Sequence, residues 1–218
     1  MKLKISLLLV DDHALVREML SARLNAEPDM VVVGTAADAD DAIGQAVRLR
    51  PDIVVMDVDM PGVLCFEAAR VIQERCAGTR ILFLSAFFHD RYVEQALAAK
   101  AAGYVIKADP PERIVAAIRS VAGGASYFSE EVQERIVVSS EGTRLAARRQ
   151  SRAATLTPRE LEILRYIARG MAQKEVARTM HVSVPTVRTH TANLMKKLGI
   201  HDRVELTRFA IREGLAEA

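Results

Sequence analysis

The chain lacks tryptophan, has only two cysteines and contains no long uninterrupted apolar run. Cys65 and Cys76 match neither a disulfide framework nor a CxxC metal pattern, so we expect small hydrophobic residues in a reducing compartment. Without a long apolar run the sequence offers no membrane span, and residues 1–10 reach Asp11 too soon for a signal peptide. We therefore expect a cytoplasmic protein with no membrane partner.

Charge is unevenly distributed along the 218 residues, although the net charge is only +2. Residues 1–143 hold 15 basic and 21 acidic residues, whereas residues 144–218 hold 15 basic and 7 acidic residues. An acidic N-terminal part and a basic C-terminal part indicate two modules, of which the second is expected to bind a polyanion. Nucleic acid is the leading candidate, because no helix sets a bulky aromatic face against clustered lysines, as a membrane surface would require.

The first module alternates short apolar runs with amphipathic stretches. Five β/α repeats of this kind are typical of a doubly wound parallel sheet with helices on both faces. We therefore predict an α/β domain over residues 1–123 with a five-stranded, flavodoxin-like sheet. The expected strands are 5–10, 31–35, 53–57, 81–84 and 104–106, and the expected helices lie near 14–26, 38–49, 66–75, 90–101 and 111–122.

Polar residues follow these strands at the points where the strands end. Asp11 and Asp12 follow the first strand, Asp57 ends the third, Ser85 follows the fourth and Lys107 follows the fifth. Open α/β sheets place their chemistry at the carboxyl ends of the strands. Clustered carboxylates raise one another's pKa unless a cation lies among them, and both Mg²⁺ and the lysine would serve. The pattern indicates a phosphoryl-transfer pocket in which the third-strand aspartate becomes an aspartyl phosphate.

The rest of the chain divides into a linker and a helical module. Residues 124–154 contain a Ser/Ala/Arg-rich stretch that is typical of a tether. Residues 155–218 show only helix signals, beginning with a capping box formed by Thr157 and Glu160. Ser183 begins the third of four expected helices, and the tight turn at 181–183 joins the second helix to it. We predict an all-α domain containing a helix-turn-helix.

The motifs of the first module resemble the receiver domain of two-component response regulators. The matching segments are Val-Asp-Asp-His at 10–13, Met-Asp-Val-Asp-Met-Pro-Gly at 56–62, Ser-Ala at 85–86 and Gly-Tyr-Val-Ile-Lys at 103–107. The resemblance implies that Asp57 is the phospho-acceptor. It also implies that Asp12 and Asp57 bind Mg²⁺ directly, Asp11 through water and Asp59 through its backbone carbonyl. It also implies that Ser85 and Lys107 stabilise the phosphoryl oxygens, and that Tyr104 is a switch residue that turns inward.

The second module resembles the LuxR-type helix-turn-helix domain of NarL/FixJ-class regulators. The matching segments are Leu-Thr-Pro-Arg-Glu at 156–160, Lys-Glu-Val-Ala at 174–177, Thr-Val-Arg-Thr-His at 186–190 and Lys-Lys-Leu-Gly at 196–199. The third helix is then the recognition helix, with Arg188 and Thr189 nearest to base edges in the major groove. The expected DNA-contacting residues are Lys174, Thr186, Arg188, Thr189, Asn193, Lys196 and Lys197.

Together the resemblances imply a response regulator that a histidine kinase phosphorylates and that binds double-stranded DNA to control transcription. It is expected to dimerise when phosphorylated, with RNA polymerase as a further candidate partner, and to have no enzyme activity beyond self-phosphorylation and slow autodephosphorylation. One alternative is a regulator that binds DNA constitutively, without phosphorylation. Another is a phosphatase of the haloacid-dehalogenase type, because Asp57-Val58-Asp59 after a strand also resembles that nucleophile motif.

Overall fold

The computed structural model describes residues 4–60, 65–86, 90–133, 136–139, 142–145, 152–213 and 215. The chain falls mainly into two compact units, which divide after Leu145. Among the described residues, no helix combines the length and the apolar character that spanning a bilayer requires.

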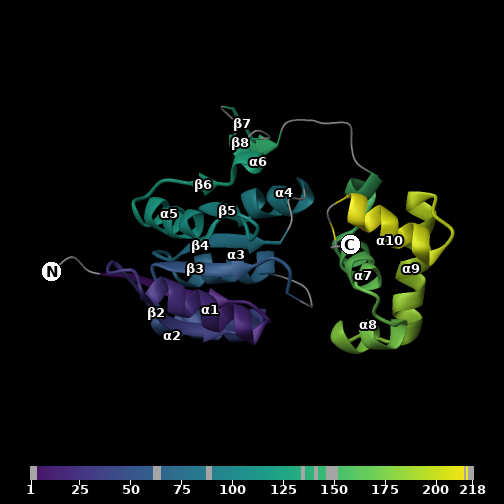
Figure 1. Cartoon of the computed structure of the whole chain (residues 1–218), viewed down its shortest axis with the longest axis horizontal. Coiled ribbons are helices and arrows are strands. Elements are labelled where there is room, and N and C mark those ends of the chain that lie inside the picture. The colour runs from purple at the N-terminus through teal and green to yellow at the C-terminus, as the bar shows by residue number, and fades with distance from the viewer. Residues whose placement is uncertain are drawn as a thin grey trace. The chain divides into compact units, whose positions relative to one another are not determined.

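The first unit is built on a parallel sheet in the strand order β2-β1-β3-β4-β5-β6 (Figure 1). Every neighbouring pair of strands is parallel. The predicted doubly wound α/β fold is confirmed, with one strand more than expected. The strands are β1 (Ile5–Val10), β2 (Met30–Ala36), β3 (Ile53–Asp57), β4 (Arg80–Ser85), β5 (Gly103–Ile106) and β6 (Tyr127–Phe128).

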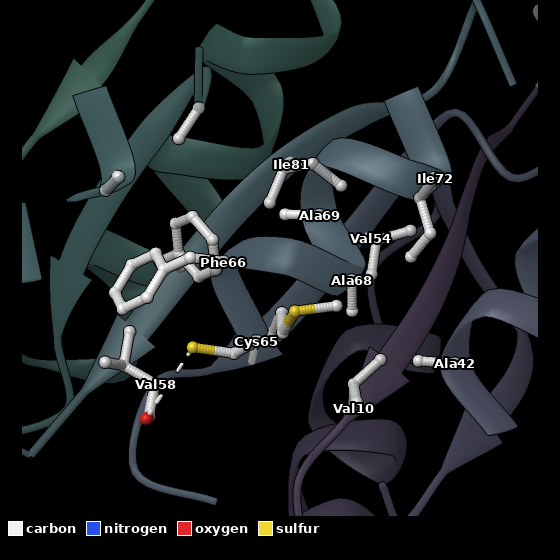
Figure 2. Packing of buried hydrophobic residues seen from close by; sticks show 14 of the residues in the cluster. Val10, Ala42, Val54, Val58, Cys65, Phe66, Ala68, Ala69, Ile72 and Ile81 are labelled. Carbon is white, nitrogen blue, oxygen red and sulfur yellow. Dashed lines mark hydrogen bonds between the residues drawn. The ribbon is translucent and has the colours of Figure 1, made fainter. Parts of the chain in front are cut away.

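Helices cover both faces of the sheet because the central strands carry apolar side chains on both sides. On one face, Leu7, Val55 and Leu82 pack with Leu24 of α1 and Ile118 of α5. Figure 2 shows part of the opposite cluster, in which α2 and α3 cover alternate residues of the same strands. The helices are α1 (Ala14–Asn25), α2 (Ala39–Leu49), α3 (Cys65–Arg75), α4 (Asp90–Ala98) and α5 (Pro111–Ala122).

The segment 124–154, for which the sequence predicts a linker, begins with structure that belongs to the first unit. Strand β6 pairs with β5, and Gly103 permits this because a Cβ there would lie 2.5 Å from the Tyr127 carbonyl oxygen. Val132, in the short helix α6 (Glu130–Gln133), is completely buried. Strands β7 (Ile136–Ser139) and β8 (Gly142–Leu145) form a separate antiparallel pair. The sequence does not reveal β6, because a strand of two residues is too short to show an alternating pattern.

The second unit has the four predicted helices, preceded by the short 3₁₀ helix η1 (Arg152–Thr155). The predicted capping box is present, since Thr157 Oγ1 accepts from Glu160 N–H and the Glu160 carboxylate accepts from Thr157 N–H. Leu161, Val187 and Leu206 are among the buried residues that hold the helices together. The helices are α7 (Pro158–Ala168), α8 (Gln173–Thr179), α9 (Val184–Leu198) and α10 (Arg203–Arg212).

Candidate functional site

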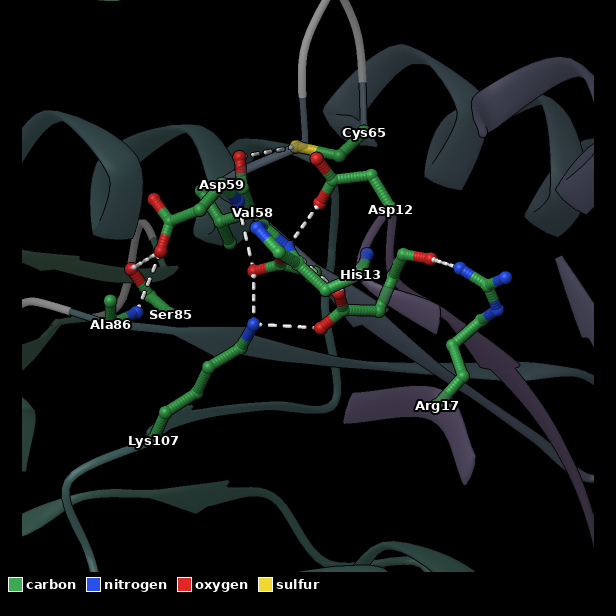
Figure 3. Close-up of polar contacts among 11 residues, drawn as sticks. Asp12, His13, Arg17, Val58, Asp59, Cys65, Ser85, Ala86 and Lys107 are labelled. Carbon is green, nitrogen blue, oxygen red and sulfur yellow. Dashed lines mark hydrogen bonds and ion pairs between the residues drawn. The ribbon is translucent and has the colours of Figure 1, made fainter. Parts of the chain in front are cut away.

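The strand order places the predicted pocket residues at one edge of the first sheet. Since β1, β3, β4 and β5 are adjacent and parallel, their carboxyl ends lie side by side, and the polar residues that end them converge. Asp11, Asp57, Ser85 and Lys107 come from these four strand ends. Figure 3 shows Ser85 and Lys107 among the polar contacts at this edge. Asp11, Asp57 and Ser85 are buried, with at most 5% of their surface exposed.

Lys107 joins two of the carboxylates. Its Nζ atom lies 2.7 Å from Oδ2 of Asp11 and 3.1 Å from Oδ1 of Asp57. The backbone N–H of Asp59 also donates to Oδ1 of Asp57, at 2.9 Å. One oxygen of the Asp57 carboxylate is therefore held by an ammonium and an amide, which orients the whole group.

The other oxygen of Asp57 is available for chemistry. Oδ2 is buried, and it has no hydrogen-bond partner within the described part of the chain. Ligand atoms of Asp11, Asp12, His13 and Asp57 all lie within 4.8 Å of one another. Carboxylate oxygens are the donors that a hard divalent cation prefers, so these residues fit Mg²⁺. A buried oxygen with unused lone pairs is the observation that supports this fit.

The electrostatics of the pocket follow from burial and close charges. Burial raises the pKa of Asp57 to about 7, against the opposing effect of Lys107, and Asp59 and Asp11 add to the increase. Burial alone would lower the pKa of Lys107, but the adjacent Asp57 and Asp11 outweigh it and raise that pKa. Without a bound cation, the carboxylates are therefore only partly neutralised by the single lysine.

Ser85 and Tyr104 lie behind the pocket, where the receiver resemblance places the hydroxyl and the switch aromatic. Both side chains are completely buried. The Tyr104 ring is part of the apolar cluster formed with α3 and α4, so it points inward in this structure. Burial raises the pKa of Tyr104 well above its ordinary value, and the phenol therefore stays protonated.

Two contacts at the pocket could not be predicted from sequence patterns. The guanidinium of Arg17, one turn into α1, donates to the backbone carbonyl of Asp11. His13, to which the sequence assigns no chemistry, has its Nδ1 atom 2.9 Å from Oδ1 of Asp12. Helical periodicity places Arg17 on α1, but it does not indicate that the side chain folds back onto the preceding loop.

The carboxylate of Asp59 makes a third contact of this kind. Only the backbone carbonyl of this residue has a role in the receiver resemblance, yet the residue is buried, with a relative exposure of 7%. Asp59 Oδ2 accepts a hydrogen bond from the backbone N–H of Ala86 at 2.6 Å. The hydroxyl of Ser85 donates to the same oxygen over a longer distance, 3.5 Å.

In the second unit, α9 has one buried face and one exposed face. Val187, Leu194 and Leu198 are buried. The exposed predicted DNA-contacting residues are Lys174 on α8 and Arg188, Thr189, Asn193, Lys196 and Lys197 on α9. Thr186 is half-buried, and its hydroxyl lies 2.7 Å from that of Ser183 at the start of the helix.

Lys197 differs from the other basic residues of this face because its charge is paired within the domain. Its Nζ atom lies 2.7 Å from Oε2 of Glu160, a buried carboxylate of α7. Burial would raise the pKa of Glu160, but Lys197 and the hydrogen bonds with Thr157 hold it below the ordinary value. Lys196 has no such ion pair among the described residues, so it is the freer of the two lysines.

Comparison with known proteins agrees with the two units. Residues 7–119 match the response regulator receiver domain family, and residues 154–210 match the bacterial regulatory proteins of the luxR family. The uncharacterized transcriptional regulatory protein YxjL of Bacillus subtilis is 35% identical over 214 residues, which cover 98% of each chain. The oxygen regulatory protein NreC of Staphylococcus aureus is 36% identical over 214 residues, covering 97% of this chain and 99% of that protein.

Solved structures are similar as well. A two-component response regulator of the LuxR family from Aurantimonas sp. SI85-9A1 is 34% identical, with a TM-score of 0.58, and covers 60% of this chain and 94% of its own. RcsB of Salmonella enterica serovar Typhimurium, bound to promoter rprA with BeF3⁻, shares the fold at 21% identity and a TM-score of 0.62, over 94% of this chain and 98% of its own. The chain therefore belongs to the LuxR family of response regulators, in which a receiver domain precedes a DNA-binding helix-turn-helix domain.

Proposed function

We propose that a sensor histidine kinase phosphorylates Asp57 in the presence of Mg²⁺, and that this phosphorylation controls DNA binding by the C-terminal domain. The observation that carries the proposal is the state of the Asp57 carboxylate. Its Oδ1 atom is held by Lys107 and the Asp59 amide, and its buried Oδ2 atom has no hydrogen-bond partner within the described residues. An oriented carboxylate with one free oxygen is suited to nucleophilic attack.

The reaction forms an acyl phosphate. Oδ2 of Asp57 attacks the phosphorus of a phosphohistidine in line with the P–N bond, which breaks and leaves its electron pair on the imidazole nitrogen. That nitrogen then takes a proton from water. Slow autodephosphorylation returns the protein to its unphosphorylated form. Water attacks the phosphorus and the P–O bond to Asp57 breaks, which releases inorganic phosphate and the free carboxylate.

The remaining pocket residues stabilise the transferred group. Asp11, Asp12, Asp57 and the Asp59 backbone carbonyl would hold Mg²⁺, which neutralises charge on the phosphoryl oxygens when bound. Lys107 lies between Asp11 and Asp57, so its ammonium can follow an oxygen of the new phosphoryl group. Ser85 offers its hydroxyl, and Tyr104, which is already buried in this structure, is the proposed switch residue.

The C-terminal domain reads DNA with α9. Arg188 and Thr189 are exposed near the N-terminal end of the helix, where recognition helices meet base edges, while Asn193, Lys196 and Lys174 suit the flanking backbone. The phosphorylated protein is proposed to act as a homodimer on paired half-sites, with RNA polymerase as a candidate further partner. Since its target is chromosomal DNA, we place it in the bacterial cytoplasm.

The decisive experiment treats the full chain with Mg²⁺ and acetyl phosphate and follows intact mass, gel filtration and DNA binding. Asp57→Ala removes the acceptor, and Asp52→Ala is the matched control because that carboxylate lies at the other end of β3. We expect one phosphoryl adduct in the wild type and the control, none in Asp57→Ala, and tighter DNA binding with dimerisation only where the adduct forms.

Each alternative predicts a different result in the same experiment. DNA binding by an existing dimer, with no adduct, would favour the constitutive regulator. Multiple turnover of a small phosphate ester would favour the phosphatase.

A further inference from the structure

The buried carboxylate of Asp59 accepts hydrogen bonds from donors at the phosphorylation pocket. Its Oδ2 atom accepts from the Ala86 amide at 2.6 Å, and Ser85 Oγ lies 3.5 Å from the same atom (Figure 3). The Ala86 amide and the Ser85 hydroxyl converge on one oxygen and together form an anion-binding site, which we call the seat. Asp59, two residues after the proposed acceptor, occupies this seat in the structure.

The seat lies beside Asp57. The amide of Asp59 donates to Oδ1 of Asp57, and Ser85 follows Leu84, which pairs with Asp57 across β3 and β4. The negative charge of Asp59 is also one of the causes of the raised pKa of Asp57. The two carboxylates therefore already interact before any phosphoryl group is added.

Phosphorylation would add further negative charge at the same place. A phosphoryl group on Asp57 presents three oxygens, of which the metal ion and Lys107 can each hold one. The third needs hydrogen-bond donors, and the hydroxyl of Ser85 and the amide of Ala86 are the donors next to it. The Asp59 carboxylate both occupies these donors and repels the incoming charge across a poorly solvated space.

We propose that the Asp59 carboxylate occupies, in the unphosphorylated protein, the seat that a phosphoryl oxygen of Asp57 takes after phosphorylation. This inference rests on the proposed function and deepens it. Asp59 acts as an internal competitor that must leave the Ala86 amide, so it sets how strongly the pocket accepts a phosphoryl group. Its side chain thus has a role distinct from the metal-binding role of its backbone carbonyl.

The test measures binding of fluoroberyllate, a phosphoryl mimic, to the full chain at saturating Mg²⁺ by fluorine NMR and calorimetry. Asp59→Asn removes the charge with little change of shape, and Asp59→Ala empties the seat. Magnesium affinity is measured separately for each protein so that saturation is assured. We expect about tenfold tighter fluoroberyllate binding for Asp59→Ala and a smaller gain for Asp59→Asn, because each loses a charged competitor for the donors.

Asp52→Ala is the matched control. Asp52 Oδ2 also accepts from a backbone N–H and a hydroxyl, both of Ser6, at 2.7 and 2.6 Å, but it lies at the opposite edge of the sheet. The control should bind fluoroberyllate as the wild type does. As a direct readout of the contact, the Ala86 amide proton should shift upfield in metal-free Asp59→Ala and stay unchanged in Asp52→Ala.

The outcomes separate this inference from the proposed function. A wild type that binds no fluoroberyllate in an Asp57-dependent way would overturn the proposed function, and this inference with it. A wild type that binds, beside Asp59 variants that bind equally or more weakly at saturating Mg²⁺, would overturn this inference alone. Tighter binding by Asp59→Asn by itself is sufficient support if Asp59→Ala does not fold.

Discussion

Lys197 of the recognition helix forms an ion pair with Glu160 of α7, with 2.7 Å between Nζ and Oε2. The Lys197 side chain is also exposed to solvent, so the contact with DNA that the sequence predicts stays a prediction beside this ion pair. Glu160 also closes the capping box of α7 with Thr157, so one buried carboxylate fixes both the start of α7 and its contact with α9. Lys197 therefore contributes to the position of the recognition helix.

Replacing Lys197 by methionine should weaken the C-terminal domain by about 1–2 kcal/mol, because the buried carboxylate loses its cation. Since the pKa of Glu160 is lowered in the folded domain, its contribution is present above the ordinary pKa and is lost as pH falls through the lowered value. Hydrogen exchange of the α7 and α9 amides at pH 7 measures the loss. Lys196→Met is the control, because Lys196 has no ion pair among the described residues. Equal exchange in Lys197→Met and Lys196→Met would contradict the structural role.

Base recognition and phosphate contact should be separable on α9. Arg188→Ala should lower affinity for the specific site by about 1–3 kcal/mol and reduce the preference over random DNA, because a base-edge contact is lost. Lys196→Ala should weaken binding to both DNAs alike and reduce the slope of affinity against salt by about 1. Binding titrations at several salt concentrations provide both quantities. Identical changes in preference for the two variants would contradict this division.

The raised pKa of Asp57 predicts a pH-dependent stability in metal-free buffer. With a pKa of about 7 in the folded state, the ionised carboxylate destabilises the fold at pH 8, and the penalty disappears as pH falls toward the ordinary value. Asp57→Asn should therefore be more stable than the wild type at pH 8, by about 1–3 kcal/mol, with the difference shrinking toward pH 5. Urea unfolding in the presence of a chelator measures this difference.

Magnesium provides the complementary check on that variant. Mg²⁺ should stabilise the wild type by binding only the folded pocket, and it should stabilise Asp57→Asn much less. Asp52→Asn, altered at the other end of β3, should respond to Mg²⁺ like the wild type. Equal stabilisation of all three proteins would mean that the ion binds elsewhere.

Ser129 is expected to hold β6 and α6 on the receiver domain. Its buried hydroxyl accepts from the Ile106 amide at 3.0 Å and donates to the Asp109 carboxylate at 2.6 Å. Ser129→Ala should lower the unfolding free energy of the receiver domain by about 1–3 kcal/mol, since it leaves a buried amide without its partner. Thermal unfolding measures the change beside the exposed control Ser126→Ala. Unfolding temperatures that do not differ between the two variants would contradict this role.

Much of this protein can be predicted from local sequence patterns. Apolar runs that end in Asp57 or Ser85 predict parallel strands, and parallel strands bring their carboxyl ends to one edge whatever the details of packing. The capping box at Thr157 and the buried stripe of Val187 and Leu194 follow in the same way from helical periodicity. The identity of the pocket residues therefore needs only the order of the strands, and short-range periodicity supplies the elements that carry them.

Other features depend on contacts between residues that are distant along the chain. Only the folded chain shows that Lys107 joins Asp11 to Asp57, that Lys197 pairs with Glu160, and that Asp59 reaches the Ala86 amide. The added strand β6 likewise depends on the close approach that Gly103 allows. Sequence alone determined which residues end the strands and helices, because hydrophobic periodicity is a local property. The tertiary structure decided which atoms pair and how deeply each charge is buried, because both depend on packing around the whole sheet or helical bundle.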